Sequence, residues 1–156
     1  MNATTYDESP RTVILQAEVS EFVTHQAGHR IGNRFGAGRK AYTTTRYRNY
    51  VKELRAKFGY DGELFEGALE VRMIFDYAVK SKKPKWLRTT RPDLDNLSKS
   101  VLDALEGVVF TDDAQVSDLT LSKRNHSLAE SMTLTVMVRE ISDGDQQLDI
   151  RRRRQR

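Results

Sequence analysis

The chain has 156 residues, of which 26 are Lys or Arg and 22 are Asp or Glu, so its formal net charge is +4. This length predicts one domain, and the clustering of its apolar residues predicts a hydrophobic core with polar margins. The absence of cysteine excludes disulfides, thiolate metal sites and thiol chemistry. We expect no secretory signal, because residues 1–11 are polar, and no membrane span, because no apolar run approaches about 20 residues.

The first half of the chain predicts a strand, a helix and a second strand. Residues 1–11 are typical of a disordered leader, and residues 13–23 alternate between apolar and polar side chains as strands do. Residues 25–40 are rich in Gly, Arg and Asn and predict a long basic loop. Apolar residues at helical spacing predict a helix over 43–58, capped by the cluster Thr43–Thr45 and ended by Gly59. Residues 68–79 alternate well and predict a half-buried strand.

The second half predicts one more helix and two more strands. After a basic loop over 80–92, an apolar stripe predicts a helix over 93–106, with Gly107 just past its end. Residues 115–124 and 132–140 predict strands, which we expect to pair as a hairpin. The order β-α-β-α-β-β predicts an α+β domain over 12–140, with a small mixed or antiparallel sheet and two main helices. A polar, Arg-rich tail follows over 141–156.

Positive charge gathers in three segments. Residues 30–57 hold nine Lys or Arg against the single acid Glu53, residues 80–92 hold six and no acid, and five arginines fall within the last six residues. Patches of this size predict a polyanionic partner, nucleic acid above all. For the terminal arginines alone, a solvated tail is an equally good interpretation.

The stretch Arg91–Val116 holds the most informative pattern, and it begins with two aspartates. Pro92 disfavours a helix that starts before Asp93. We therefore expect Asp93 at the extended entry to the helix and Asp95 just inside it. Side chains two residues apart point the same way on an extended chain, so the two carboxylates can converge there.

More acidic side chains follow on the same helix and after it. Asp95, Lys99 and Asp103 stand four residues apart and form one polar stripe, and the next turn returns Asp112 and Asp113 towards it. Carboxylates that gather in one place repel one another unless a cation lies between them, and hard oxygen ligands favour Mg²⁺ or Mn²⁺. Such an ion would activate a water against a phosphodiester, with Lys99 stabilising the developing charge.

The same residues also have a purely structural interpretation. Asp93 and Asp95 favour a helix N-terminus through capping and the helix dipole. Asp95 and Lys99 are a common surface pair, and Asp112 followed by Asp113 is common in turns. On spacing alone, this interpretation outweighs the catalytic one, because short acidic motifs recur by chance.

The identity and order of the residues change that balance. The run Asp93-Leu-Asp-Asn-Leu-Ser-Lys99, then Asp103-Ala-Leu, Gly107 and Asp112-Asp-Ala-Gln-Val116, resembles the signature of the RusA family of Holliday-junction resolvases, which are common in prophages. The resemblance covers Arg91–Val116 and implies a RusA-like fold. It also implies a homodimeric, Mg²⁺-dependent endonuclease, with Mn²⁺ as a substitute, that cuts four-way DNA junctions in the cytoplasm of a bacterial or phage-infected cell. A two-fold junction needs two cuts, and a two-fold dimer supplies two sites.

Residue roles follow from this resemblance by position. It implies that Asp93, Asp95 and Asp113 are the catalytic metal ligands, that Lys99 is the functional lysine, and that Asp103 and Asp112 are secondary acidic residues. Trp86 lies upstream and can stack on or insert between bases, although a lone Trp is more often a packing residue. Our candidates for contact with the DNA backbone are Arg39, Lys40, Arg46, Lys82, Lys83, Lys85, Arg88 and Arg91.

Two alternatives stay open beside the resolvase. One is a protein that keeps the fold and binds branched DNA without cutting it, with strong salt dependence. The other is a nuclease for a different DNA or RNA structure, because a fold does not fix a substrate.

Overall fold

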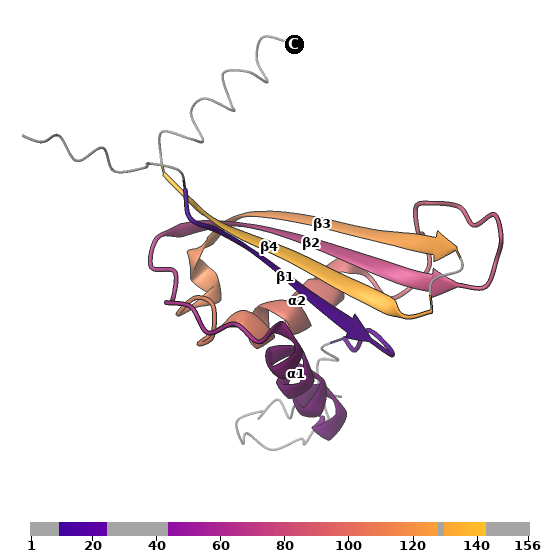
Figure 1. Cartoon of the computed structure of the whole chain (residues 1–156), viewed down its shortest axis with the longest axis horizontal. Coiled ribbons are helices and arrows are strands. Elements are labelled where there is room, and N and C mark those ends of the chain that lie inside the picture. The colour runs from indigo at the N-terminus through magenta and orange to yellow at the C-terminus, as the bar shows by residue number, and fades with distance from the viewer. Residues whose placement is uncertain (1–9, 25–43, 128–129, 143–156) are drawn as a thin grey trace, which may run out of the picture.

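The computed structural model describes residues 10–24, 44–127 and 130–142. In these ranges the elements follow the order β1 (Thr12–Val19), α1 (Thr45–Phe58), β2 (Ala68–Val79), α2 (Leu94–Leu105), the short 3₁₀ helix η1 (Asp113–Gln115), β3 (Val116–Ser127) and β4 (Met132–Ile141). The strands form one mixed sheet in the order β1-β4-β2-β3, and both helices lie on the same side of it (Figure 1). This confirms the predicted α+β class. No helix in the described ranges is long and apolar enough to cross a membrane.

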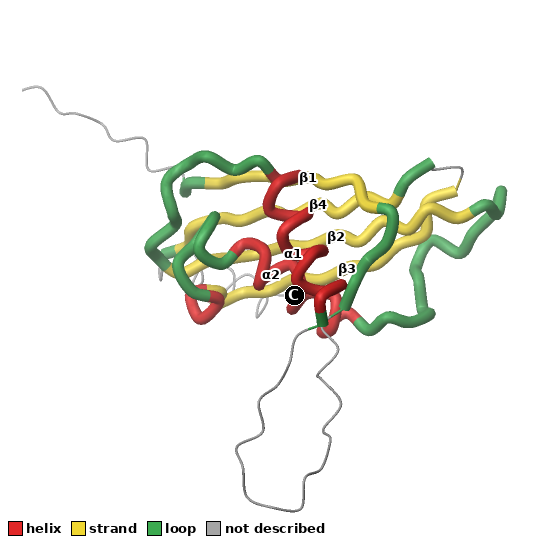
Figure 2. The backbone as a smooth tube through the Cα atoms, turned by 90° about the horizontal axis from the view of Figure 1, so that it is seen from below, coloured by secondary structure: helices red, strands yellow, loops and turns green. Residues whose placement is uncertain are grey.

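The core lies between the sheet and its two helices, which cover one face (Figure 2). Alternate residues of each strand point to this face, so the period of two in the sequence becomes a continuous apolar layer. The layer includes the buried side chains Leu54 of α1, Val71, Met73 and Phe75 of β2, Leu97, Val101 and Leu105 of α2, and Leu134, Val136 and Val138 of β4. Each large side chain buried in this way contributes about 1.5–3 kcal/mol.

The predicted pairing of the last two strands is wrong. The strand β2 lies between them, parallel to β3 and antiparallel to β4. The short connection favoured a hairpin, but β2 is the most apolar strand and takes one of the two central positions, where it packs between two neighbours. A parallel pair needs a long crossover, and α2 provides it between β2 and β3.

The helix ends follow the sequence signals. The Thr44 side chain accepts a hydrogen bond from the Tyr47 backbone N–H at 3.2 Å, and Gly59 ends α1 in the left-handed region with φ +55°. Gly107 follows α2 with φ +72°. Both glycines occupy a conformation that other residues adopt only at a cost, so the chain leaves each helix where the sequence predicts.

On the opposite face of the sheet, the described residues form ion pairs and no second layer of helices. The Glu70 carboxylate, with 4% of the residue exposed, accepts hydrogen bonds from Arg72 at 2.6 Å and Arg139 at 2.7 Å. Burial opposes its ionisation, but these two bonds outweigh that effect and lower the pKa of Glu70 below its ordinary value. Asp76 and Arg124 form a second pair, with N–O distances of 2.8 and 2.9 Å.

Candidate metal centre and nucleic-acid interface

Asp93 stands at the entry to α2 in an extended conformation, with φ −77° and ψ 150°. Its backbone carbonyl accepts the Leu97 N–H at 3.1 Å, but its side chain makes no capping hydrogen bond. Asp95 lies in the first turn, and both aspartates are exposed. The expected positions of Asp93 at the extended entry and of Asp95 just inside the helix are therefore confirmed, and the carboxylate of Asp93 makes no capping hydrogen bond.

The backbone before Asp93 is fixed from β3. The Lys123 ammonium donates hydrogen bonds to the carbonyl oxygens of Thr90 and Pro92, both at 2.8 Å. Because Lys123 projects from the sheet, these bonds tie the end of the basic loop to a rigid element. These two hydrogen bonds fix the position where the chain enters α2 and therefore the position of the Asp93 backbone.

Lys99 is at the centre of the polar stripe of α2. Its ammonium lies 2.8 Å from Asp103 and 3.2 Å from Asp113. The hydrogen bond to Asp103 raises the pKa of Lys99 above its ordinary value; partial burial opposes this and the bond to Asp113 adds to it. The ammonium is therefore charged throughout the neutral range, and it offsets the repulsion between the two carboxylates.

Helix α1 holds the far end of this stripe in place. The Tyr47 hydroxyl donates to the second oxygen of Asp103 at 2.5 Å, and burial together with this bond raises the pKa of Tyr47. The Arg55 guanidinium donates to the carbonyl oxygens of Asp103, Ala104 and Glu106 at 2.9–3.1 Å. These bonds satisfy carbonyls that the last turn of a helix leaves without partners.

A locked turn brings Asp113 back to α2. The Gln115 side chain accepts the backbone N–H groups of Thr111 and Asp112 at 2.9 and 3.0 Å, and donates to the carbonyls of Phe65 and Gly67 at 2.9 and 3.1 Å. The Asp112 carboxylate in turn accepts the Ala114 N–H at 2.8 Å. Gln115 therefore joins this turn to the loop before β2, and Asp112 has a capping role within it.

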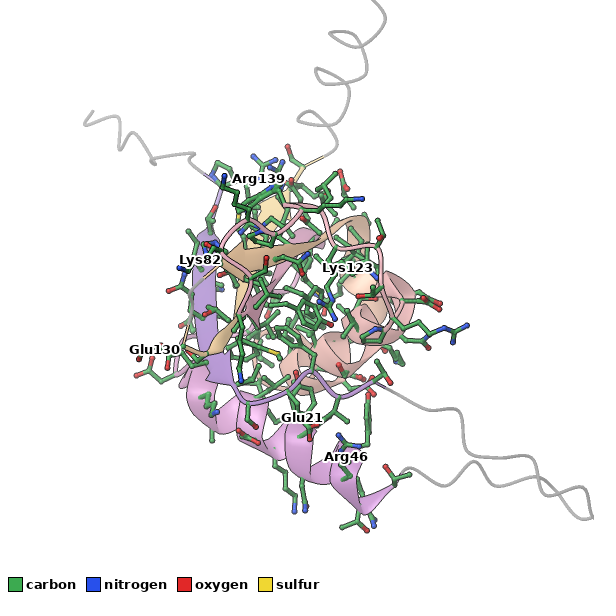
Figure 3. All side chains as sticks on the ribbon, turned by 90° about the vertical axis from the view of Figure 1, so that its right-hand side faces the viewer. Glu21, Arg46, Lys82, Lys123, Glu130 and Arg139 are labelled. Atoms are coloured by element: carbon green, nitrogen blue, oxygen red, sulfur yellow. The ribbon has the colours of Figure 1, made fainter. Side chains whose placement is uncertain are left out.

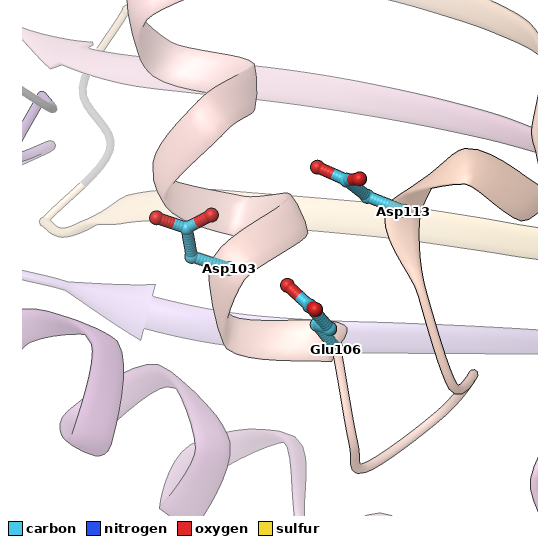
Figure 4. Close-up of side chains that lie close together, drawn as sticks. All are labelled: Asp103, Glu106 and Asp113. Carbon is cyan, nitrogen blue, oxygen red and sulfur yellow. The ribbon is translucent and has the colours of Figure 1, made fainter.

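Three carboxylates meet beside this turn. Oxygens of Asp103, Glu106 and Asp113 all lie within 4.8 Å of one another, each residue half-buried (Figure 4). Oxygen ligands stand about 2.0–2.1 Å from Mg²⁺, so two of them on opposite sides of one ion are about 4 Å apart. Small rotations of these side chains would meet that requirement. The group fits a divalent cation, which would compete with the Lys99 ammonium for Asp103 and Asp113.

The structure brings together only part of the predicted ligand set. Asp113 and Lys99 lie in the acidic group, but among the residues that the structure describes Asp93 and Asp95 join no group of three carboxylates at this spacing. Asp95 and Asp103 are eight residues apart, about 12 Å along the helix axis, so one ion cannot contact both. Asp113 is the residue common to the predicted set and to the observed group.

The predicted DNA contacts differ in their surroundings. Lys82, Lys83, Lys85 and Arg91 are exposed on the basic loop, whereas Arg88 is half-buried with its guanidinium carbon 3.9 Å from the centre of the Tyr77 ring. Arg46 forms an ion pair with Glu21 near the start of α1 (Figure 3). Arg39 and Lys40 lie outside the described residues.

The sequence interpretation missed three residues of this region. Glu106 is three residues after Asp103 and so shares its helix face, a spacing that would have found it. Lys123 and Gln115 act on backbone groups that are distant in sequence, and no local signal reveals such contacts.

The comparison with known proteins agrees with this arrangement. A family model described as "Endodeoxyribonuclease RusA" matches residues 23–139, which include both helices and most of the sheet. The class is therefore that of the DNA endonucleases, and the chain belongs to the RusA family.

Two relatives match a shorter part of the chain. The chain is 43% identical to the uncharacterized protein YqaN of Bacillus subtilis (strain 168) over 63 residues, which are 40% of this chain and 42% of the relative. The chain is also 41% identical to the crossover junction endodeoxyribonuclease rusA of Lactococcus phage r1t over 59 residues, which are 36% of this chain and 45% of the relative. The chain thus spans less than half the length of these curated relatives.

Proposed function

We propose that this protein is a divalent-metal-dependent endonuclease that resolves four-way DNA junctions, acting as a homodimer in the cytoplasm. The observation that carries the proposal is the acidic face of α2, where Asp113 returns from a distant turn to face Lys99 and Asp103. Membership of the RusA family and the likeness to the crossover junction endodeoxyribonuclease of phage r1t support the choice of substrate.

Asp93, Asp95 and Asp113 would hold the ion, which is Mg²⁺ or Mn²⁺ because all the donors are hard oxygens. When bound, such an ion activates a water and neutralises charge on the scissile phosphate. Lys99 provides a permanent positive charge beside Asp113 for the developing charge on the phosphate. The exposed lysines of the loop over 80–92 would hold the DNA backbone.

The ligand set is tested by two single variants. Asp95→Asn should abolish cleavage of a synthetic four-way junction in Mg²⁺ and weaken Mn²⁺ binding measured by calorimetry. Asp103→Asn is the matched control, since it removes one carboxylate from the same helix face. If Asp103→Asn abolishes metal binding and Asp95→Asn does not, the ion belongs to the group of Asp103, Glu106 and Asp113, and the proposed ligand set is wrong.

The substrate is tested with the unaltered protein. A four-way junction, a flap, a duplex and an RNA hairpin are incubated with it at one Mg²⁺ concentration, and we expect paired cuts in the junction alone. Binding of the junction without cleavage in Mg²⁺ or Mn²⁺ would make the protein a non-catalytic binder, and preferential cutting of another substrate would make it a different nuclease. Sedimentation with and without the junction tests the dimer.

A further inference from the structure

The segment before Arg88 extends the sheet past the edge of β3. The Asn125 backbone N–H donates to the Trp86 carbonyl at 2.9 Å, and the Arg88 N–H donates to the Lys123 carbonyl at 3.3 Å. The Asn125 side chain adds a bond to the Lys85 carbonyl at 2.8 Å. Trp86 therefore stands on backbone that is hydrogen-bonded to the sheet, although it belongs to the basic loop.

Trp86 lies outside the hydrophobic core. It is 53% exposed, and its ring contacts are with the polar side chains of Arg124 and His126. The Arg124 guanidinium carbon lies 4.8 Å from the centre of its ring, and the His126 ring lies 5.5 Å away. Because Arg124 is also paired with Asp76, the ring rests against an ordered side chain, and much of its surface faces solvent.

The surroundings of Trp86 are basic. The loop over 80–92 carries six Lys or Arg and no acid, and Lys82, Lys83 and Lys85 are exposed. An exposed aromatic ring among cations suits a ligand with a flat π-face on an anionic backbone. A paired duplex hides the faces of its bases, whereas a strand with unpaired bases offers both features.

We propose that Trp86 is a stacking platform for an unpaired nucleobase of a DNA strand, with the neighbouring lysines contacting its phosphates. This inference rests on the proposed function, because it assumes that DNA is the ligand. The platform would hold one base outside the stack where strands separate, at the branch point of a junction. It assigns Trp86 a role in binding and leaves hydrolysis to the acidic face of α2.

The test uses the fact that Trp86 is the only tryptophan of the chain, so its fluorescence reports on this position alone. The full chain is titrated in EDTA, which prevents cleavage, with a single-stranded oligonucleotide and with a strand of the same length that lacks its bases. Binding is followed separately by the anisotropy of a dye on the DNA. We expect strong quenching by the strand with bases and little by the abasic strand or a blunt duplex, even where anisotropy shows binding. Equal quenching by all three ligands would overturn the proposal.

Variants give a second, independent measurement. Trp86→Ala should weaken binding of the single strand by about five- to hundredfold, and Trp86→Phe should retain most of it. Leu87→Ala is the matched control, because Leu87 is 66% exposed on the same segment but offers no π-face, and it should bind within about twofold of the parent. Circular dichroism checks that each variant is folded.

The outcomes separate this inference from the proposed function. If the parent chain binds no DNA of any kind, both are wrong. If Trp86→Ala binds DNA and cuts the junction as the parent does, the stacking platform is wrong and the nuclease stands. If an acidic peptide quenches Trp86 and single-stranded DNA does not, the partner is a protein and the proposal fails.

Discussion

Lys99 stands at the midpoint of the acidic face, four residues from both Asp95 and Asp103. Its raised pKa follows first from the hydrogen bond to Asp103 and means that its charge does not change near neutral pH. A side chain of constant charge cannot act as a pH switch, but it can hold carboxylates together before a metal arrives. Lys99 would then have two roles: it would assist cleavage, and its ammonium would compete with the metal ion for the carboxylates of Asp103 and Asp113.

This dual role can be measured with Lys99→Gln. Removing the ammonium should strengthen Mn²⁺ binding by about two- to fivefold, because an exposed ion pair contributes about 0.5–1 kcal/mol. The same variant should cut junctions at least tenfold more slowly, because the developing charge loses its partner. Calorimetry and a cleavage assay give the two values. Weaker metal binding in the variant would show that Lys99 organises the site and does not compete for it.

The buried Glu70 predicts how stability depends on pH. The pKa of the Glu70 carboxyl is lower in the folded state than in the unfolded chain, where a Glu has a pKa of about 4.3. The folded state therefore binds the carboxyl proton less tightly. Its contribution is therefore complete above the unfolded pKa and is lost as the pH falls through the folded pKa. Glu70→Gln should lower the free energy of unfolding at pH 7 by about 1.5–3 kcal/mol, and this difference should shrink below about pH 4.

Urea denaturation at neutral and acidic pH provides the measurement. Glu66→Gln is the control, because Glu66 is exposed nearby, and it should change stability by less than about 0.5 kcal/mol. A Glu70→Gln deficit that is as large at pH 3 as at pH 7 would refute the ionic origin of the effect.

At the scale of elements, the turn between α2 and β3 decides whether a site exists. Helix α2 carries Lys99 and Asp103, and Glu106 follows at its C-cap. Asp113 reaches these residues only because the chain reverses after Gly107 and Gln115 holds the turn. The four hydrogen bonds of Gln115 connect two segments of backbone, its own turn and the loop before β2.

Gln115→Leu keeps the size of the side chain and removes these four bonds. It should destabilise the fold by about 1–3 kcal/mol, mainly because the part-buried carbonyl groups of Phe65 and Gly67 lose their donors. Junction cleavage should fall as well under conditions where the variant is folded, because Asp113 is no longer held. Thermal unfolding and the cleavage assay test both effects, with Asp118→Asn on exposed β3 as the near-neutral control. Full cleavage activity in folded Gln115→Leu would show that the turn needs no such lock.

Across the whole molecule, negative and positive surfaces come from neighbouring elements. The acidic face belongs to α2 and the turn after it, and the basic loop leads directly into α2. A phosphodiester backbone held by the loop would therefore lead towards Asp93 at the start of α2. Such binding must depend on salt, because each neutralised phosphate releases counterions.

Replacing Lys82, Lys83 and Lys85 by Ala together should make junction binding less dependent on salt. The slope of log K against log salt should fall by about 0.9 for each phosphate contact that is lost. Lys52→Ala, on the exposed side of α1, should leave the slope unchanged. Anisotropy titrations at several salt concentrations provide the slopes. An unaltered slope in the triple variant would place the DNA elsewhere.

Much of the secondary structure could be predicted from the sequence. Both helices, their caps at Thr44, Gly59 and Gly107, and four strands follow from apolar periodicity and turn residues, because these signals act over a few residues. The order of residues from Asp93 to Val116 gave the family, and its spacing placed Lys99 between acidic neighbours on one helix face. The role of each acidic residue is still a prediction that the metal-binding variants must test.

Tertiary structure alone decided which strands pair and which carboxylates meet. The sequence favours a hairpin between β3 and β4, but the apolar β2 separates them. An apolar strand is best covered between two neighbouring strands, and the length of the loop does not decide this. Lys123, Gln115 and Arg55 bind backbone groups that lie tens of residues away. Glu106 joins Asp103 and Asp113 only once the chain turns after α2. Local patterns determine which elements form, whereas contacts between distant residues depend on how those elements pack.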